Sequence, residues 1–338
     1  MPAKVRWGVL GTAKIGTLKV IPAMQRGEYC TIVAIASRDH QRARQAAKEL
    51  GIPGSWGSYD ELLQDRDIDA VYIPLPNHMH VPWAIKAIQA GKHVLCEKPV
   101  ALSSAEAAQL AAAAKEHPDR CVMEAFMYRF HPQWQKAKEL ADSGTIGEVM
   151  AVRSFFSYYN VDPGNIRNRV EAGGGALMDI GCYCISFSRY ITGSEPVRVL
   201  GMQDHDPEMK TDRATSGILE FPGGAVGMFT CSTQMGPFQR CTIHGTQGSM
   251  VIEIPVNAPA DASTRIRLQN NDGMKELVFG PVDQYTLQGD AFAGAVLERT
   301  PAPIPLDDAV NNMAVIDAMI ESARTNAWVT LRGGIPRR

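Results

Sequence analysis

Residues 5–16 read VRWGVLGTAKIG, and this stretch decides the fold of the first part of the chain. A short apolar run predicts a buried strand, and Gly11, Ala13 and Gly16 follow it with the spacing of a G-x-G-x-x-G turn. Backbone amides at the start of the next helix can bind a pyrophosphate, and small residues allow close approach. A strand-to-helix turn without a ligand is the alternative, because Ala13 departs from the motif. The predicted cofactor-binding residues of this turn are Gly11, Thr12, Ala13, Lys14, Ile15 and Gly16.

Four more apolar runs, separated by helical patterns, extend this unit. They read TIVAIAS, AVYIPLP, HVLCEKP and CVMEAF, and they are rich in the residue types of strands that are covered on both faces. Two of the helical patterns read DHQRARQAAKEL, which ends at Gly51, and SSAEAAQLAAAAKEH, which ends before Pro118. The alternation predicts an α/β Rossmann domain with a parallel sheet over residues 1–125, whose final helical elements reach about residue 147.

From about residue 148 the pattern changes to hairpins. The segments GILEFPGGAVGMFTC, RCTIHGTQGSMVIEI and TRIRLQNNDGMKEL each place turn residues between two strand-like runs. Ile266 and Leu268 alternate with Arg265 and Arg267, which indicates one buried and one charged face. Helices are expected at 284–299 and 306–325. These patterns predict a C-terminal α+β domain over residues 148–330 with a mostly antiparallel sheet.

Length, charge and cysteine content restrict the class of protein. The chain has 338 residues, which favours two domains. Its 34 Lys+Arg and 36 Asp+Glu give a formal charge of -2, so no net positive field attracts nucleic acid or an anionic membrane. The 7 cysteines lack the paired spacing of a zinc site, and no run of 18 apolar residues occurs. We expect a soluble, cytoplasmic protein without a nucleic-acid or membrane partner.

The second strand ends in Ser37-Arg38-Asp39, where a dinucleotide-binding fold contacts the adenosine ribose. A carboxylate at this point accepts hydrogen bonds from the 2′-hydroxyl of NAD, whereas a 2′-phosphate favours a hydroxyl and a guanidinium. Ser37 and Arg38 come first, so the sequence predicts NADP. The alternative is that Arg38 is solvated and Asp39 binds the ribose.

Two segments follow the third and fourth strands, at the sheet edge where such folds bind ligands. PLPNHMH and Glu97-Lys98-Pro99 could both face the nicotinamide, although a lysine before proline is more often a surface residue. We predict a cis Lys98-Pro99 bond, since proline is the residue that makes such bonds accessible. No metal site is predicted, because His78 and His80 have no third ligand at a recognisable spacing. Further cofactor-binding candidates are Pro74, Leu75, Asn77, His80, Glu97 and Lys98.

In the second domain, residues 171–187 read EAGGGALMDIGCYCISF. A glycine triplet precedes a helix on which Asp179 and Tyr183 are four residues apart and so share one face. The glycines would let the start of this helix approach another body closely. A core tyrosine is the alternative for Tyr183, and Cys182 and Cys184 are predicted core residues.

Taken in order, several segments resemble the glucose-fructose oxidoreductase and inositol dehydrogenase family over nearly the whole chain: VLGTAKIG, SRD, YIPLPNHMH, GKHVLCEKP, MEAFMYRFHP, GGGALMDIGCYCI and VNNMAVIDAMIESA. The resemblance implies a Rossmann domain and a C-terminal domain with an open sheet. Many members use that sheet for dimer contacts, so a homodimer or homotetramer is expected. It also implies catalytic roles for Lys98, Tyr183 and Asp179, and substrate binding by Arg129, Arg167 and Tyr183.

Members that resemble inositol dehydrogenase carry a histidine where this chain has Tyr183. Tyrosine at this position, together with NIRN around Arg167, is similar to the branch of dihydrodiol dehydrogenases and NADP-dependent sugar dehydrogenases. The resemblance therefore implies an NADP(H)-dependent oxidoreductase that transfers hydride to or from a hydroxyl or carbonyl carbon of a sugar or cyclic diol. The alternative is a non-catalytic NADP-binding sensor on the same fold, against which the intact Lys98 and Tyr183 argue.

The pair of Lys98 and Tyr183 suits proton exchange with the substrate oxygen. A tyrosine with its ordinary pKa of about 10 is poorly matched to neutral pH. An ammonium about 4 Å away, at an effective dielectric constant of about 20, stabilises the phenolate by roughly 4 kcal/mol, or about 3 pKa units. Lys98 is the predicted source of that charge.

Overall fold

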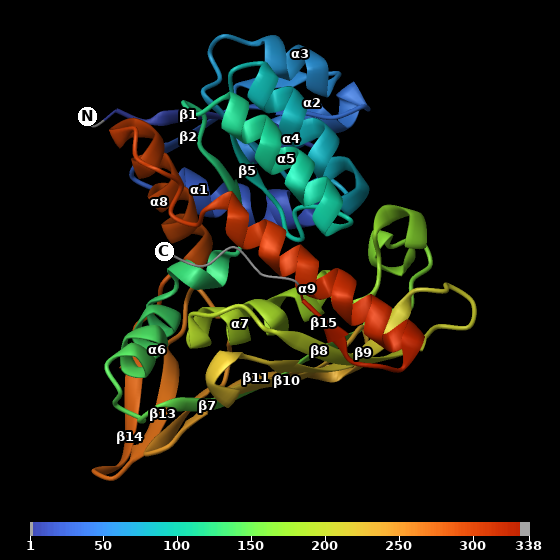
Figure 1. Cartoon of the computed structure of the whole chain (residues 1–338). Coiled ribbons are helices and arrows are strands. Elements are labelled where there is room, and N and C mark those ends of the chain that lie inside the picture. The colour runs from blue at the N-terminus through green and yellow to red at the C-terminus, as the bar shows by residue number, and fades with distance from the viewer. Residues whose placement is uncertain (1–2, 332–338) are drawn as a thin grey trace. The chain divides into compact units, whose positions relative to one another are not determined.

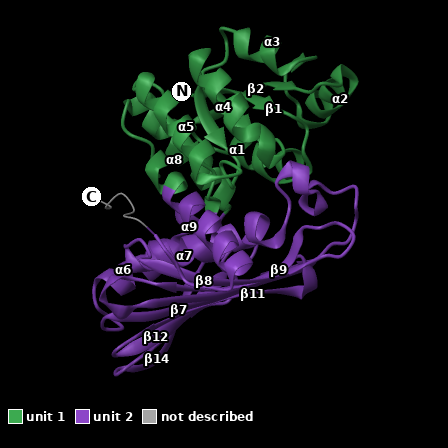
Figure 2. Ribbon diagram, turned by 45° about the vertical axis from the view of Figure 1, so that its right-hand side comes forward, with its two compact units in different colours: residues 1–127, 283–310 green, residues 128–282, 311–338 purple. Residues whose placement is uncertain are grey.

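The computed structural model describes residues 3–331 and divides the chain into two compact units (Figures 1 and 2). Unit 1 comprises Met1–Met127 and Asp283–Val310, and unit 2 comprises Tyr128–Val282 and Asn311–Arg338. Each unit is therefore discontinuous in sequence, whereas the hairpin pattern alone suggests one boundary between residues 125 and 148. Among residues 3–331, no helix has the length and apolar character needed to cross a membrane.

Unit 1 is built on a six-stranded parallel sheet with the order β3-β2-β1-β4-β5-β6, which is the strand order of a dinucleotide-binding fold. The sequence predicts all of these strands except β3, which has only three half-exposed residues. The parallel Rossmann sheet is confirmed. Its strands are β1 (Val5–Leu10), β2 (Cys30–Ala36), β3 (Gly54–Trp56), β4 (Ala70–Ile73), β5 (His93–Cys96) and β6 (Val122–Glu124).

Short polar side chains cap several helices of unit 1. Asp39, Ser58 and Ser103 each accept hydrogen bonds from backbone amides in the first turn of the helix that follows, and Gly51 ends one helix in a left-handed conformation. The first helix opens with the π-helical turn η1 (Gly16–Val20). The helices are α1 (Ile21–Gln25), α2 (His40–Leu50), α3 (Tyr59–Gln64), α4 (His80–Gln89), α5 (Ser104–Glu116) and α8 (Gln284–Glu298), with the 3-10 turn η2 (Asn77–Met79) before α4.

Helix α8 joins unit 1 although it follows the second sheet in sequence. The ring of Phe292 lies 5.3 Å from that of Trp7 on β1, centroid to centroid. The Asp290 carboxylate accepts hydrogen bonds from the backbone amides of Glu28 and Tyr29, at 3.0 and 2.9 Å. These contacts explain why a C-terminal helix belongs to the N-terminal unit.

Unit 2 is built on a nine-stranded mixed sheet with the order β14-β13-β12-β11-β7-β10-β9-β8-β15. Neighbouring strands are antiparallel except β7 and β10, which pair in parallel. The three predicted hairpins are β9–β10, β11–β12 and β13–β14, so the mostly antiparallel sheet is confirmed. The strands are β7 (Val149–Tyr159), β8 (Arg198–His205), β9 (Asp212–Glu220), β10 (Val226–Ser232), β11 (Gln234–Gly245), β12 (Gly248–Ile252), β13 (Thr264–Asn270), β14 (Gly273–Phe279) and β15 (Val329–Thr330).

Helices cover one face of this second sheet (Figure 1). They are α6 (Pro132–Asp142), α7 (Cys182–Thr192) with the preceding π-helical turn η6 (Leu177–Gly181), and the part of α9 (Leu306–Thr325) that lies in unit 2. Met319 of α9 lies so close to Gly201 and Gly217 that a Cβ at either glycine would come within 2.7 Å of it. Ile266 and Leu268 are buried while Arg265 and Arg267 are exposed, as their alternation predicts.

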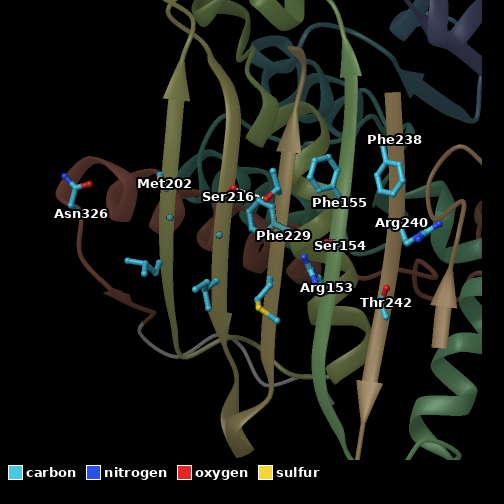
Figure 3. Close-up of a pocket in the computed structure, with 16 residues that line it drawn as sticks. Arg153, Ser154, Phe155, Met202, Ser216, Phe229, Phe238, Arg240, Thr242 and Asn326 are labelled. Carbon is cyan, nitrogen blue, oxygen red and sulfur yellow. Dashed lines mark hydrogen bonds between the residues drawn. The ribbon is translucent and has the colours of Figure 1, made fainter. Parts of the chain in front are cut away.

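The opposite face of the second sheet carries a hollow of about 860 Å³ (Figure 3). Apolar side chains, uncharged polar side chains and two arginines, Arg153 and Arg240, line it. Met202 is 70% exposed and Phe238 is 47% exposed. Apolar side chains therefore lie uncovered on this face of unit 2.

Candidate active site

The glycine-rich turn lies between β1 and the first helix, as the sequence predicts. Gly11 has φ +114°, and its backbone amide donates to the Ala36 carbonyl at 2.8 Å. A Cβ at Gly11 would lie 3.0 Å from Leu75, so both backbone conformation and space favour glycine. The Ala13 carbonyl accepts from the Thr17 amide, so the helix begins directly after the turn. The amides of its first turn have no carbonyl within the helix and can serve an anion.

The end of β2 separates the two candidate ribose contacts. The Asp39 carboxylate accepts hydrogen bonds from the amides of Gln41 and Arg42, at 3.0 and 3.3 Å, and so caps α2. The Ser37 hydroxyl is buried and accepts from the Asp39 amide at 3.2 Å, whereas Arg38 is exposed. The capping role of Asp39 favours Ser37 and Arg38 as the pair that contacts a ribose phosphate.

Tyr59, the first residue of α3, is a site residue that the sequence does not reveal. Burial raises the pKa of its hydroxyl, and the neighbouring Arg38 opposes this rise through its charge and a hydrogen bond. The same hydroxyl would lie 3.8 Å from a Cβ at Gly11. The predicted phosphate site of unit 1 therefore brings together Arg38, Tyr59 and the glycine turn. No local motif indicates this, because it depends on where α3 packs.

A side chain of the neighbouring strand β4 bonds to the turn that follows β5. The hydroxyl of the fully buried Tyr72 on β4 donates to Glu97 Oε1 at 2.7 Å. Burial and then the Glu97 charge raise the pKa of Tyr72 well above its usual value, so Tyr72 is a donor. Glu97 Oε2 accepts from the Lys98 amide at 3.3 Å. The Lys98-Pro99 peptide bond is cis, which confirms the prediction.

His80 lies inside unit 1 and not at its surface. Its side chain is 0% exposed, and its two ring nitrogens lie 2.8 Å from the Pro99 carbonyl and 2.7 Å from the Leu75 carbonyl. Burial lowers the pKa of His80 to about 4. Of the other candidates in this loop, Leu75 is buried, while Asn77 is half-buried. Within residues 3–331 there is no group of three side chains able to hold a metal ion.

The glycine triplet of unit 2 serves contacts within that unit. A Cβ at Gly174 would lie 2.4 Å from the Arg167 carbonyl, and Gly175, with φ +120°, would place its Cβ 1.9 Å from the Asp212 carboxylate. Asp212 also accepts from the Leu177 amide at 2.8 Å and from the Thr215 hydroxyl at 2.6 Å. Gly174 and Gly175 are therefore required by neighbours in the same unit, and the approach of the helix start to another body stays a prediction.

Asp179 anchors two other side chains. Its Oδ2 atom accepts a hydrogen bond from the Tyr158 hydroxyl at 2.6 Å and lies 3.0 Å from Arg167 Nε. Burial and then the Asp179 charge raise the pKa of Tyr158, so the phenol keeps its proton. The structure thus brings the predicted residues Asp179 and Arg167 together with Tyr158, which nothing in the strand sequence FFSYY distinguishes. The Asp179 carboxylate can therefore position the segment that contains Arg167.

Tyr183 lies in an aromatic cluster at the start of α7. Its side chain is 4% exposed, and its ring centroid lies 6.1 Å from those of Tyr128 and Phe156. The Arg129 guanidinium lies 4.4 Å above the Tyr190 ring on the same helix. Packing against these rings fixes the orientation of the Tyr183 ring.

Two family models match the chain. An oxidoreductase family with an NAD-binding Rossmann fold matches residues 5–126, and the GFO/IDH/MocA C-terminal domain matches residues 134–251. An uncharacterized oxidoreductase of Rhizobium meliloti is 44% identical over 97% of this chain and 99% of its own length. D-xylose 1-dehydrogenase (NADP(+)) 2 of Haloferax volcanii is 39% identical over 96% of this chain and 99% of its own.

A solved structure resembles the whole chain. It is a 3-ketoreductase from Actinomadura kijaniata in complex with NADP and TDP-benzene, which superposes with a TM-score of 0.89 at 29% identity and covers 94% of this chain and 98% of its own. The similarity therefore extends over both units, each matched by a family model.

Replacing Arg38 by alanine tests the ribose-phosphate site. A charge-assisted hydrogen bond is worth about 1.5–3 kcal/mol, so Arg38→Ala should weaken NADP binding by about 10- to 150-fold and change NAD binding little. Fluorescence titration with both cofactors measures this, with Arg44→Ala, an exposed arginine on α2, as the control. Equal losses for the two cofactors, or a wild-type preference for NAD, would show that Arg38 does not read the phosphate.

Replacing Asp212 by asparagine tests its buried carboxyl. Burial raises the pKa of Asp212 to about 6, so the folded chain holds this proton more tightly than the unfolded chain. The group therefore adds stability as the pH falls from about 6 to 4 and loses that contribution as the pH rises. The free energy of unfolding of both proteins is measured in urea at pH 7 and at pH 4.5. The difference between wild type and Asp212→Asn should be about 1–3 kcal/mol more favourable to wild type at pH 4.5 than at pH 7. A difference that stays constant would contradict this, and Asp204→Asn, at an exposed position, is the control.

Proposed function

The chain belongs to the GFO/IDH/MocA family of oxidoreductases, and on that premise we propose that it transfers hydride between NADP(H) and a carbon that carries a hydroxyl or carbonyl group in a sugar or cyclic diol. The observation that carries the proposal is the edge of the first sheet. There the glycine turn, Arg38 with Tyr59 and the turn of Lys98 all follow parallel strands of one unit. This arrangement supports a dinucleotide site at the edge of the sheet, with Lys98 proposed to lie beside the nicotinamide.

The residues of unit 1 fit the cofactor. The first-turn amides after Gly11 suit the pyrophosphate, and Ser37 and Arg38 suit the 2′-phosphate. The loop with Pro74, Leu75 and Asn77 and the turn with Glu97 and Lys98 follow the next two strands, where the nicotinamide would be held. When bound, NADP(H) accepts or supplies the hydride.

Tyr183 is the proposed proton carrier. In the oxidation direction the hydroxyl proton of the substrate passes to the Tyr183 oxygen as hydride leaves the carbon, and in reduction the phenol returns that proton to the carbonyl oxygen. Lys98 is the proposed source of the positive charge that stabilises the phenolate during the reaction. Arg167, held by Asp179, and Arg129 are proposed to bind the substrate.

A panel of aldoses, ketoses and cyclic diols tests the function directly. Absorbance of NADPH is followed in both directions, with NADH and NAD as parallel cofactors. We expect turnover of at least one sugar or diol with a preference for NADP(H). Tight binding of NADPH without turnover of any compound would favour a cofactor-binding sensor.

Removing one hydroxyl separates proton transfer from binding. Tyr183→Phe deletes the proton carrier and keeps the ring that packs against Tyr128 and Phe156, so kcat should fall about 10²- to 10⁴-fold. The dissociation constant of NADPH should change little. Tyr159→Phe, at a 64% exposed tyrosine, is the control. Retention of most of the wild-type rate by Tyr183→Phe would refute the assignment.

We also propose self-association through the open face of the second sheet, as a homodimer or homotetramer. Apolar side chains from neighbouring strands, among them Met202, Ile218, Met228 and Phe238, lie exposed around the hollow of that face (Figure 3). An uncovered apolar area of this kind favours association. Light scattering of the dilute protein should give a multiple of the chain mass, and Ile218→Lys should shift it toward the monomer. A monomeric wild type would contradict the proposal.

A further inference from the structure

One buried histidine joins two loops at the edge of the first sheet. His80 is the first residue of α4, and its ring lies between the Leu75 carbonyl, in the loop after β4, and the Pro99 carbonyl, in the turn after β5. Strands β4 and β5 are parallel neighbours, so these two segments leave the sheet side by side. The imidazole therefore lies within hydrogen-bond distance of both the loop of the predicted nicotinamide site and the residue that directly follows Lys98.

The chemistry of the contact makes apolar replacement costly. Both carbonyls accept hydrogen bonds and neither can donate. Because burial lowers the pKa of His80 to about 4, the ring is neutral near pH 7 and its single N–H donates to one of the two carbonyls. Because His80 is 0% exposed, water does not replace the lost bond when the ring is removed. An unpaired carbonyl in this position would favour movement of the turn.

Two other buried groups hold the same turn. Glu124 on β6 accepts a hydrogen bond from the Val100 amide at 2.8 Å, and Tyr72 on β4 donates to Glu97 at 2.7 Å. The Pro99 carbonyl and the Val100 amide are therefore bonded to side chains of α4 and β6, and the Glu97 side chain that precedes them is bonded to a side chain of β4. Such a frame is the usual means of orienting a reacting side chain.

We propose that His80 is a positioning residue that fixes the turn of Lys98 and acts on catalysis through Lys98 alone. This rests on the proposed function, because the orientation of Lys98 affects turnover only if Lys98 acts in the reaction. The competing interpretation is a core histidine that contributes stability and nothing more. The two differ in where the effect of a substitution is seen.

Hydrogen exchange shows whether His80 holds the turn. In His80→Leu the peptide that spans residues 96–102 should exchange at least about tenfold faster than in wild type, whereas His80→Gln, which retains an amide donor, should lie between the two. The matched control is His93→Leu, because His93 is a half-buried histidine at the opposite end of β5, bonded to the Cys121 amide. Unchanged exchange in His80→Leu, or an equal increase in His93→Leu, would overturn the proposal.

A double-mutant cycle shows whether His80 acts through Lys98. The turnover number is measured for His80→Leu and Lys98→Met, alone and combined, on the best substrate of the panel, after correction for the folded fraction. A displaced lysine should lower kcat by about 10- to 100-fold in the wild-type background. The same change should cost less than about threefold in Lys98→Met, and His80→Gln should recover part of the loss.

The outcomes separate this inference from the proposed function. If Lys98→Met loses turnover and His80→Leu lowers kcat equally in both backgrounds, His80 is only a structural residue, and the inference is overturned while the function stands. If Lys98→Met keeps the wild-type rate, the proposed role of Lys98 fails first, and the catalytic role of His80 fails with it. The inference is supported if His80→Leu lowers kcat much more in the wild-type background than in Lys98→Met and also speeds hydrogen exchange at residues 96–102.

Discussion

The parallel alignment of β1, β2, β4 and β5 is the constraint on which the proposed cofactor site depends. Because these strands run in the same direction, the segments that follow them leave the sheet at one edge. The glycine turn, Ser37 with Arg38, the loop at residues 74–80 and the turn at residues 97–99 are distant in sequence and are brought together only by this alignment. Each segment alone is weak evidence for a dinucleotide site. Their position at one edge of the sheet supports that interpretation for all four together.

Buried polar side chains then fix the geometry of the segments that leave the sheets. In unit 1, His80, Tyr72 and Glu124 bond to the turn of Lys98. In unit 2, Asp212 holds the start of the helix that carries Tyr183, and Asp179 holds Arg167. A buried polar group without a partner is costly, so these bonds restrict the loops to few conformations. The segments that carry the candidate catalytic residues are thus fixed by buried side chains through hydrogen bonds and an ion pair.

The sequence predicts the elements of the fold well because their signals are local. Apolar runs, helix caps and turn residues identify five of the parallel strands and the three hairpins. They miss β3, which is too short to show a pattern, and the predicted hairpins leave out β7, β8 and β15. Tyr59 and Tyr158 are missed for a different reason, since their roles depend on the packing of α3 and on the distance from β7 to η6. The same holds for α8, whose place in unit 1 follows from contacts of Asp290 and Phe292 that no spacing encodes.

Lys98 and Tyr183 are proposed to serve one substrate oxygen, the lysine as a charge and the tyrosine as the proton carrier. The most direct test is a kinetic cycle of Lys98→Met, Tyr183→Phe and the double variant, with kcat measured on one substrate across pH. Groups that act as a unit should lose less in combination than the product of the single losses, and the apparent pKa of the base should rise in Lys98→Met. Losses that multiply in full, with an unchanged pH profile in Lys98→Met, would contradict the account.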